Sequence, residues 1–237
     1  MKKLFPDDDD RLVARPVSTS TGKQIGAGLF ASGYFSPGEP VLRLDWSDEE
    51  RTEILSWDDT EEEHHNRCAA VAPQWYFYIS NEHPFWYLNH SCEANVAFTN
   101  WAHSIDDVMI PLVALREIHP GDEITLDYSL TISANDGLKE GEPYAMACLC
   151  GLPACRQRLT AFVGLPRELQ LQELFRRQPF SGTIPAFIVN ESPELVQELH
   201  DRAPDLYASF QAALDSQLRL AAGFEAEYDP EEPYFLG

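Results

Sequence analysis

The sequence predicts a mainly β fold with α-helical additions, and the helices gather after Cys155. Short strand-like segments separated by Gly- and Pro-containing turns fill the chain from Leu12 to Leu130. Apolar residues at helical spacing begin at Leu165. With 237 residues, the chain can bury a substantial core, as one domain with an appendage rather than as two full domains.

The strand predictions follow from apolar patterning, taken in chain order. Residues 1–11 form an acidic start that we expect to be solvated and disordered. Residues 12–44 consist of short extended pieces broken by turns, and Val41–Leu44 is predicted as a strand. Residues 48–70 are rich in charge and are expected to form one or two short surface helices. Further strands are predicted at Trp75–Ile79, Val108–Leu115 and Glu123–Leu130, and an exposed loop at Ser133–Gly141.

Three helices are predicted near the C-terminal end, at Leu165–Gln178, Pro193–His200 and Asp205–Ala222. An acidic, Pro-containing tail follows at Glu225–Glu232. These helices could pack against the rest of the chain, dimerise or recruit a partner. The third has an apolar stripe made of Leu206, Phe210, Ala213, Leu214 and Leu218.

The charge balance limits the class of partner. The chain carries 39 Asp and Glu against 17 Lys and Arg, a net charge of −22, so binding of nucleic acid through a basic surface is not expected. A Lys- or Arg-rich protein segment would be attracted, although the excess of acid could equally serve solubility alone. We find no signal peptide, no membrane-spanning run and no disulfide framework among the five cysteines. We therefore expect a soluble, intracellular protein, nuclear or cytoplasmic, with no membrane partner.

The cysteine spacing predicts one structural zinc site. Cys148, Cys150 and Cys155 fall within eight residues, which is hard to explain by packing alone. This triplet is one ligand short of a tetrahedral Zn²⁺ site, and Cys92 is the natural fourth ligand. Such a site would join the segment that carries Cys148–Cys155, called the flap below, to the segment that contains Asn89 and His90.

Residues near the cysteines, and the chain's other cysteine and histidines, have separate expected roles. Four thiolates around one Zn²⁺ carry net negative charge, which Arg156 and Arg158 could offset. Cys68 is left over and is expected to be a small buried hydrophobic residue. A zinc-dependent hydrolase is a rival, but all-thiolate ligation leaves no open position on the metal. The other metal-like cluster, His64 and His65 after three glutamates, is interpreted as a charged surface turn.

Three further motifs combine with the cysteines. The Gly26-Ala27-Gly28 turn would let the backbone approach a ligand closely, although most such turns are only turns. The polar cluster from Asn89 to Asn95 could satisfy buried backbone groups, hold a ligand, or do both. Gly121–Tyr128 reads as a turn entering a strand that ends in Tyr128.

In this order, the four constellations resemble the SET-domain protein lysine methyltransferases with a post-SET zinc segment. The resemblance runs from Arg15 to Leu159. It implies a SET domain at 12–132, a post-SET segment at 144–160, and a helical extension with the acidic tail at 161–237. Small curved sheets would surround a pseudoknot in which residues 121–128 thread beside the 89–95 loop.

The resemblance also implies a site. S-adenosylmethionine would be held by Gly26, Ala27, Gly28, Leu29, Asn89, the backbone of His90 and Tyr128, with Leu149 over the adenine. Tyr128 would be the catalytic tyrosine, and Tyr76, Tyr78 and Trp46 are alternatives for lining the lysine channel. The substrate would be a lysine in a histone or another basic protein. The alternative is a non-catalytic SET module that acts as a zinc-stabilised interaction domain.

Overall fold

The computed structural model describes residues 10–18, 24–45, 52–56, 68–80, 83–99, 109–133, 145–180 and 183–227. Several predictions fall outside these residues. They concern the acidic start up to residue 9, the pair His64 and His65, the loop at 134–141, and the tail beyond Glu227.

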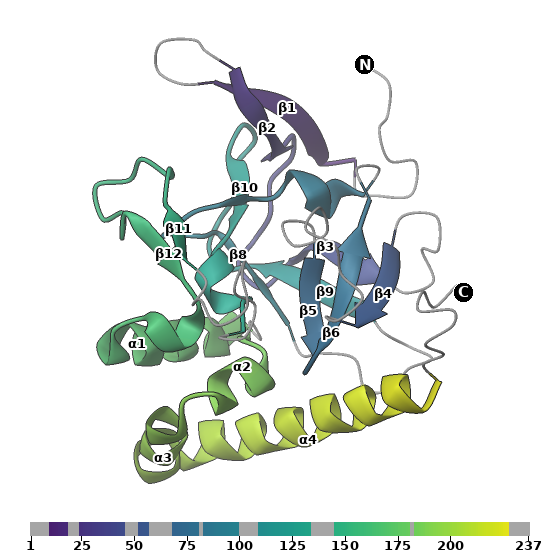
Figure 1. Cartoon of the computed structure of the whole chain (residues 1–237). Helices are drawn as coiled ribbons and strands as arrows, with labels where there is room; N and C mark the ends of the chain where they lie inside the picture. The colour runs from purple at the N-terminus through teal and green to yellow at the C-terminus, as the bar shows by residue number, and fades with distance from the viewer. Residues whose placement is uncertain are drawn as a thin grey trace.

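One sheet brings together segments that are far apart in the sequence. Its strand order is β1 (Leu12–Ser18), β2 (Gln24–Ala31), β10 (Glu123–Leu126) and β7 (Asn89–His90). The strand β2 pairs antiparallel with both β1 and β10, whereas β10 pairs parallel with β7. The predicted passage of the 121–128 segment beside the 89–95 loop is therefore confirmed (Figure 1).

Two three-stranded sheets and a hairpin complete the β part of the described chain. The order is β3 (Pro40–Asp45), β9 (Met109–Ala114), β8 (Val96–Phe98) in one sheet and β4 (Thr52–Ser56), β6 (Trp75–Ile79), β5 (Cys68–Ala72) in the other. The hairpin pairs β11 (Ala145–Ala147) with β12 (Arg158–Thr160). These elements confirm the predicted strands at 41–44, 75–79 and 108–115.

The prediction of surface helices across 48–70 is wrong at both described ends of that range. Residues Thr52–Ser56 and Cys68–Ala72 pair with opposite edges of β6. The aromatic strand β6 is a pairing template for both neighbours, and tertiary pairing overrides the charge-rich local composition. The structure places Cys68 in β5.

The predicted strand at 123–130 ends early, at Leu126. The side chain of Asp127 accepts a hydrogen bond from the backbone N–H of Ser129 at 3.2 Å and caps the 3₁₀ turn η4 (Tyr128–Leu130). A second 3₁₀ turn, η2 (Pro84–Tyr87), precedes β7. Tyr128 therefore lies on a turn and not on the sheet face that Ile124 and Leu126 share.

The helices are α1 (Arg167–Arg177), α2 (Ala186–Asn190), α3 (Pro193–Arg202) and α4 (Pro204–Glu227), with 3₁₀ turns η5 (Phe162–Gly164) and η6 (Gln178–Phe180) around α1. Three of them confirm the predicted helices. The short α2 gave no helical pattern because four of its five residues are buried and it has no polar face. None of the helices in the described ranges is long and apolar enough to cross a membrane.

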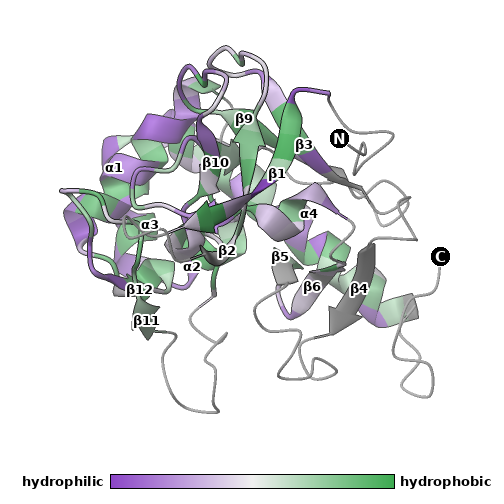
Figure 2. Cartoon of the chain, turned by 90° about the horizontal axis from the view of Figure 1, so that it is seen from above, coloured by the Kyte–Doolittle hydropathy of each residue, from purple (hydrophilic) through white to green (hydrophobic). Residues whose placement is uncertain are grey.

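The long helix α4 is part of the core. It runs along one side of the molecule in Figure 1, and Figure 2 shows apolar residues recurring along it. Phe224 is fully buried in the cluster that also contains residues of the sheets, and its ring lies 5.2 Å from that of Trp75. The C-terminal helices thus pack against the β part.

The predicted stripe on α4 holds for Phe210 and Leu214, which are buried, but not for Leu218, which is 49% exposed. Steps of four residues overshoot a helical turn by about 40° each. The buried face therefore moves on to Gln217, Leu220, Ala221 and Phe224.

Candidate functional site

The Gly-x-Gly segment and the 89–95 loop meet at one side chain. The amide Nδ2 of Asn89 donates to Ala27 O at 3.1 Å and to Glu123 Oε1 at 2.7 Å. Ala27 and Asn89 are 62 residues apart in the sequence. A Cβ at Gly28 would lie 2.5 Å from Glu123 Oε1, 2.9 Å from Val17 Cγ2 and 3.0 Å from Asn89 Nδ2, so a larger residue here would force these side chains to shift.

Beyond this contact, the described residues leave the strand uncovered at Gly26. β10 pairs with Leu29 and Phe30 of β2 and does not reach Gly26–Gly28. A Cβ built at Gly26 would meet no atom of the described chain within 4 Å, and Gly26 is exposed. The pairing of β1 with β2 is also irregular next to Gly26, as at a β-bulge. Leu29, by contrast, is fully buried and paired on both sides, so its side chain serves packing.

The rest of the loop is fastened to β10. Asn95 donates from Nδ2 to Glu123 O and accepts from Thr125 N at Oδ1, both at 2.8 Å. The backbone N–H of Ser91 donates to Leu126 O at 3.0 Å. The predicted use of these polar side chains to satisfy buried backbone groups is confirmed for Asn95, which is 4% exposed.

Tyr128 is held at both ends. Its hydroxyl donates to Leu88 O at 2.5 Å, and its backbone N–H donates to His90 Nδ1 at 3.2 Å. The rings of Tyr128 and His90 are tilted, with centroids 5.5 Å apart. A hydroxyl that donates to a carbonyl keeps its oxygen lone pairs available to accept from another group.

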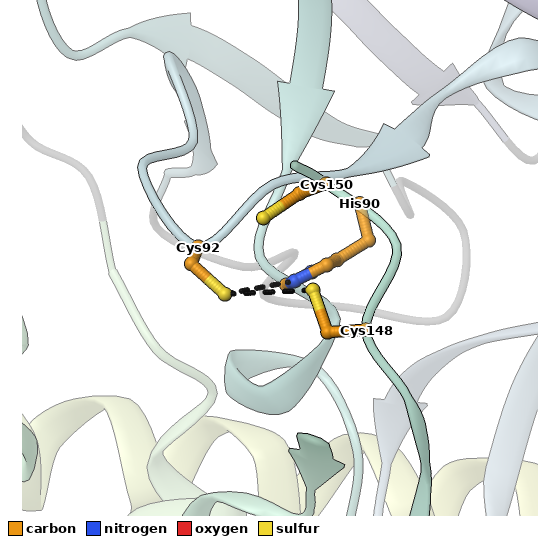
Figure 3. A group of neighbouring side chains, drawn as sticks. All are labelled: His90, Cys92, Cys148 and Cys150. Atoms are coloured by element: carbon orange, nitrogen blue, oxygen red, sulfur yellow. Dashed lines mark hydrogen bonds between the residues drawn. The ribbon is translucent and has the colours of Figure 1, made fainter. Parts of the chain in front are cut away.

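The flap reaches the 89–95 loop as the cysteine spacing predicted. Cys92 Sγ lies 3.6 Å from Cys148 Sγ, across 56 residues of sequence. Cys92, Cys148 and Cys150 and the imidazole of His90 offer atoms that all lie within 4.8 Å of one another (Figure 3). Cys155 is not among these four groups, and its Sγ accepts a hydrogen bond from the backbone N–H of Gln157 at 3.2 Å. Three of the four predicted cysteines therefore meet, together with His90, in a donor set of the kind that holds Zn²⁺ in proteins, and Cys155 as a ligand stays a prediction.

The imidazole of His90 in this cluster was not foreseen from the sequence, which assigned only its backbone a role. Its Nε2 lies 3.4 Å from Cys92 Sγ. Because Nδ1 accepts the hydrogen bond from Tyr128, the proton of the neutral ring is assigned to Nε2, which then donates to the sulfur. Burial lowers the pKa of His90 to about 4, so the ring is neutral near pH 7.

The thiols of the cluster differ in acidity. Burial raises the pKa of Cys92 and of Cys148. Burial also acts on Cys150, but hydrogen bonds from the backbone N–H groups of Cys92 and Leu152 prevail and lower its pKa to about 7. A cation in the cluster would favour the thiolate form of all of them.

A buried ion pair joins the flap to the turn that carries Tyr128. Arg156 donates to Asp127 from Nη1 at 2.8 Å and from Nη2 at 2.5 Å. The side chains are 15% and 2% exposed. Burial works against the charged form of Arg156, but hydrogen bonds and charge from Asp127 leave its pKa raised. Sequence reasoning missed this pair and treated Arg156 only as an offset for the thiolates; a lone acid between Leu126 and Tyr128 was the available signal.

The other positions predicted to line the site differ in exposure. Leu149 is 86% exposed at the tip of the flap, free to cover a ligand. Tyr76 is buried in the core cluster of the helices, and Tyr78 is partly buried. Trp46 lies outside the described residues.

This arrangement of a Gly-containing strand, an Asn-His loop and a tyrosine after β10 corresponds to a known domain. Residues 26–129 match the family model of the SET domain. The match lies within the predicted range 12–132, whose boundaries stay a prediction.

The related proteins are much longer than this chain, which spans only a small part of their length. The Histone-lysine N-methyltransferase trr of Drosophila melanogaster is 37% identical over 71 residues, which are 30% of this chain and 3% of that protein. The H3 lysine-9 specific histone-lysine N-methyltransferase SUVH4 of Arabidopsis thaliana is 34% identical over 76 residues, 31% of this chain and 12% of that protein. The solved structure of KRYPTONITE in complex with mCHG DNA and SAH aligns with a TM-score of 0.43 and 20% identity, over 63% of this chain and 29% of that one.

Proposed function

We propose that this SET-domain chain transfers a methyl group from S-adenosylmethionine to the side-chain amine of a lysine in a protein substrate. Support comes from the SET match and from the relatives, which are named histone-lysine methyltransferases. The observation that carries the proposal is the anchored Tyr128 hydroxyl, next to the loop whose Asn89 contacts β2 at Ala27. A scaffold without turnover would need neither feature.

The cofactor would lie against the Gly26–Gly28 segment, at its exposed end. The exposed Gly26 leaves room there, and the carboxylate of Glu123 beside Asn89 favours a cationic group nearby. Asn89 is held by Ala27 and Glu123, so its amide is pre-oriented. Leu149 would cover the adenine from the flap, with His90 contributing through its backbone.

One structural zinc ion would be held by Cys92, Cys148, Cys150 and Cys155, in a segment of the post-SET type. We propose Cys155 as the fourth ligand because Nε2 of His90 carries a proton in the neutral tautomer assigned above. His90 would donate to the sulfur of Cys92 and so orient a metal ligand from outside the coordination sphere. The metal has no open position in this scheme and supplies folding free energy to the flap.

Tyr128 would act on the lysine amine. A lysine ammonium has a pKa of about 10.4 and must lose its proton, to solvent water, before its nitrogen is a nucleophile. The Tyr128 oxygen, with its own proton directed to Leu88 O, can accept a hydrogen bond from the amine and orient its lone pair. S-adenosylmethionine, when bound, supplies the methyl group. Carbonyl oxygens such as that of Leu88 can make weak C–H···O contacts with a polarised methyl group.

The substrate would be a basic protein segment, histone or other. A net charge of −22 attracts Lys-rich segments and disfavours direct binding of nucleic acid, so we propose no nucleic-acid partner. Four cysteines that must stay as thiolates suit a reducing compartment, nuclear or cytoplasmic.

Incubation of the zinc-loaded chain with tritiated S-adenosylmethionine and a lysate tests the proposal, with mass spectrometry of the labelled bands. We expect label on lysines of basic proteins, and an initial rate of labelling lower by about 100-fold or more with Tyr128→Phe. Tight cofactor binding by titration without methyl transfer to any protein would instead support a non-catalytic SET module.

A further inference from the structure

Arg156 directly follows Cys155 and contacts two parts of the site, the cysteine cluster and the turn after β10. Its backbone N–H donates to Cys92 Sγ at 3.4 Å. Its guanidinium makes the two-point contact with Asp127 and a third hydrogen bond, from Nη2 to Ser129 Oγ at 3.3 Å. One residue therefore contacts the cysteine cluster through its backbone and the 128–130 turn through its side chain.

The carboxylate of Asp127 accepts most of these hydrogen bonds and is almost fully buried. Besides Arg156, its Oδ1 accepts from Ser129 N at 3.2 Å and lies 3.5 Å from His90 Nδ1. His90 Nδ1 in turn accepts from Tyr128 N. The backbone of Tyr128 is thus flanked by two groups that depend on the position of the Asp127 carboxylate.

Helix α1 contributes further charged side chains near Arg156 and Asp127. Glu173 and Arg177 are both buried and paired at 3.3 Å, and their charges act on Arg156 and Asp127. Arg176, the next residue on α1, donates to Ala94 O in the 89–95 loop at 3.1 Å. Three arginines, Arg156, Arg176 and Arg177, thus lie around two buried carboxylates, Asp127 and Glu173, and removal of Arg156 leaves Asp127 without its paired cation.

We propose that Arg156 is a positioning residue for methyl transfer, which ties closure of the cysteine-rich flap to the orientation of Tyr128 through the carboxylate of Asp127. This rests on the proposed function for the reaction that it serves. The coupling itself is a property of the described contacts: when the flap is in place, Arg156 fixes Asp127, and Asp127 fixes the turn that carries Tyr128.

The geometry requires arginine and distinguishes it from its neighbour. A guanidinium can contact both carboxylate oxygens in one plane, whereas a lysine ammonium makes a single-point contact. Arg158, two residues on, has the same charge but is exposed on β12. It is therefore a matched control for general electrostatic effects on the flap.

The test compares Arg156→Gln, Arg156→Lys and Arg158→Gln in the zinc-loaded 237-residue chain, by hydrogen exchange, zinc content and steady-state kinetics. In Arg156→Gln we expect exchange to quicken about tenfold or more both at 126–130 and at 145–156, because local opening is no longer resisted by the ion pair. Zinc content should be unchanged. We expect kcat to fall about 10- to 100-fold with KM for a basic peptide within about threefold, as for misplacement of a reacting group.

The exchange rates and kcat of Arg156→Lys should lie between those of the wild type and of Arg156→Gln. Arg158→Gln should match the wild type in exchange, zinc content and kinetics. Faster exchange confined to the flap, with 126–130 unchanged, would overturn the coupling, and so would wild-type kcat in Arg156→Gln. Should Arg156→Gln fail to fold, the milder Arg156→Lys is judged by the same two segments. If the wild type transfers no methyl group, the proposed function fails, and hydrogen exchange still decides whether Arg156 couples the flap to the turn.

Discussion

The imidazole of His90 accepts a hydrogen bond at Nδ1 from the backbone N–H of Tyr128, 38 residues later in the sequence. The same ring directs Nε2 at the sulfur of Cys92. One histidine thus bridges the proposed catalytic turn and the proposed metal cluster. Its tautomer decides whether it is a ligand or a donor to a ligand, which leads to the first prediction.

Zinc content separates the two assignments of the fourth ligand. We expect Cys155→Ser to lose most bound zinc, because three ligands hold the ion less tightly than four. We expect His90→Asn to retain about one ion, because the lost group is only a hydrogen-bond donor to Cys92. Metal analysis after dialysis measures both. Full zinc in Cys155→Ser together with loss in His90→Asn would make His90 the ligand.

Removal of the Tyr128 hydroxyl should affect chemistry and spare binding. In Tyr128→Phe we expect kcat to fall by about 100-fold or more, the usual size of a lost positioned proton-transfer or orienting group. Cofactor affinity, measured by titration, should stay within a few-fold, since the ring is retained. The control is Tyr34→Phe, a surface tyrosine that is 41% exposed. Equal turnover in the two variants would exclude Tyr128 from the reaction.

The two glycines of β2 should respond differently to the same substitution. Gly28→Ala would drive a Cβ against Glu123 and Asn89, and we expect it to destabilise the fold by about 1–3 kcal/mol. Gly26→Ala meets open space, so its stability should change by less than about 1 kcal/mol. If the cofactor occupies that space, Gly26→Ala weakens its binding nonetheless. Chemical denaturation and cofactor titration measure the two effects, and undiminished affinity in Gly26→Ala would move the cofactor elsewhere.

The sequence predicted the cysteine meeting because chemistry constrains it: three cysteines in a chain with five need a fourth ligand, and Cys92 was available. It also predicted the isolated apolar strands, such as Trp75–Ile79, whose composition and neighbours agree. The resemblance assigned Asn89 and Ala27 to one cofactor site, but their direct contact was not predicted, since spacing alone cannot pair positions that far apart.

The misses have a common physical cause, which is that partners distant in sequence set local structure. β4 is a strand because β6 pairs with it, although its own residues are polar at both ends. The strand at Glu123 stops at Leu126 because Asp127 is bound to Arg156 and caps the next turn. Neither partner can be identified from the local pattern of either segment.

The last prediction concerns the C-terminal helix, whose sequence resembled nothing in the SET family. Phe224 is fully buried against Trp75, so Phe224→Ala should cost about 3–5 kcal/mol of unfolding free energy by opening a cavity in the sheet core. Leu218→Ala, on the same helix but about half exposed, should cost less than about 1 kcal/mol. Urea denaturation followed by tryptophan fluorescence measures both. Similar small losses would mean that α4 is an accessory to the β part; a large loss at Phe224 alone makes α4 part of its core, so that truncation before Pro204 would unfold the site as well.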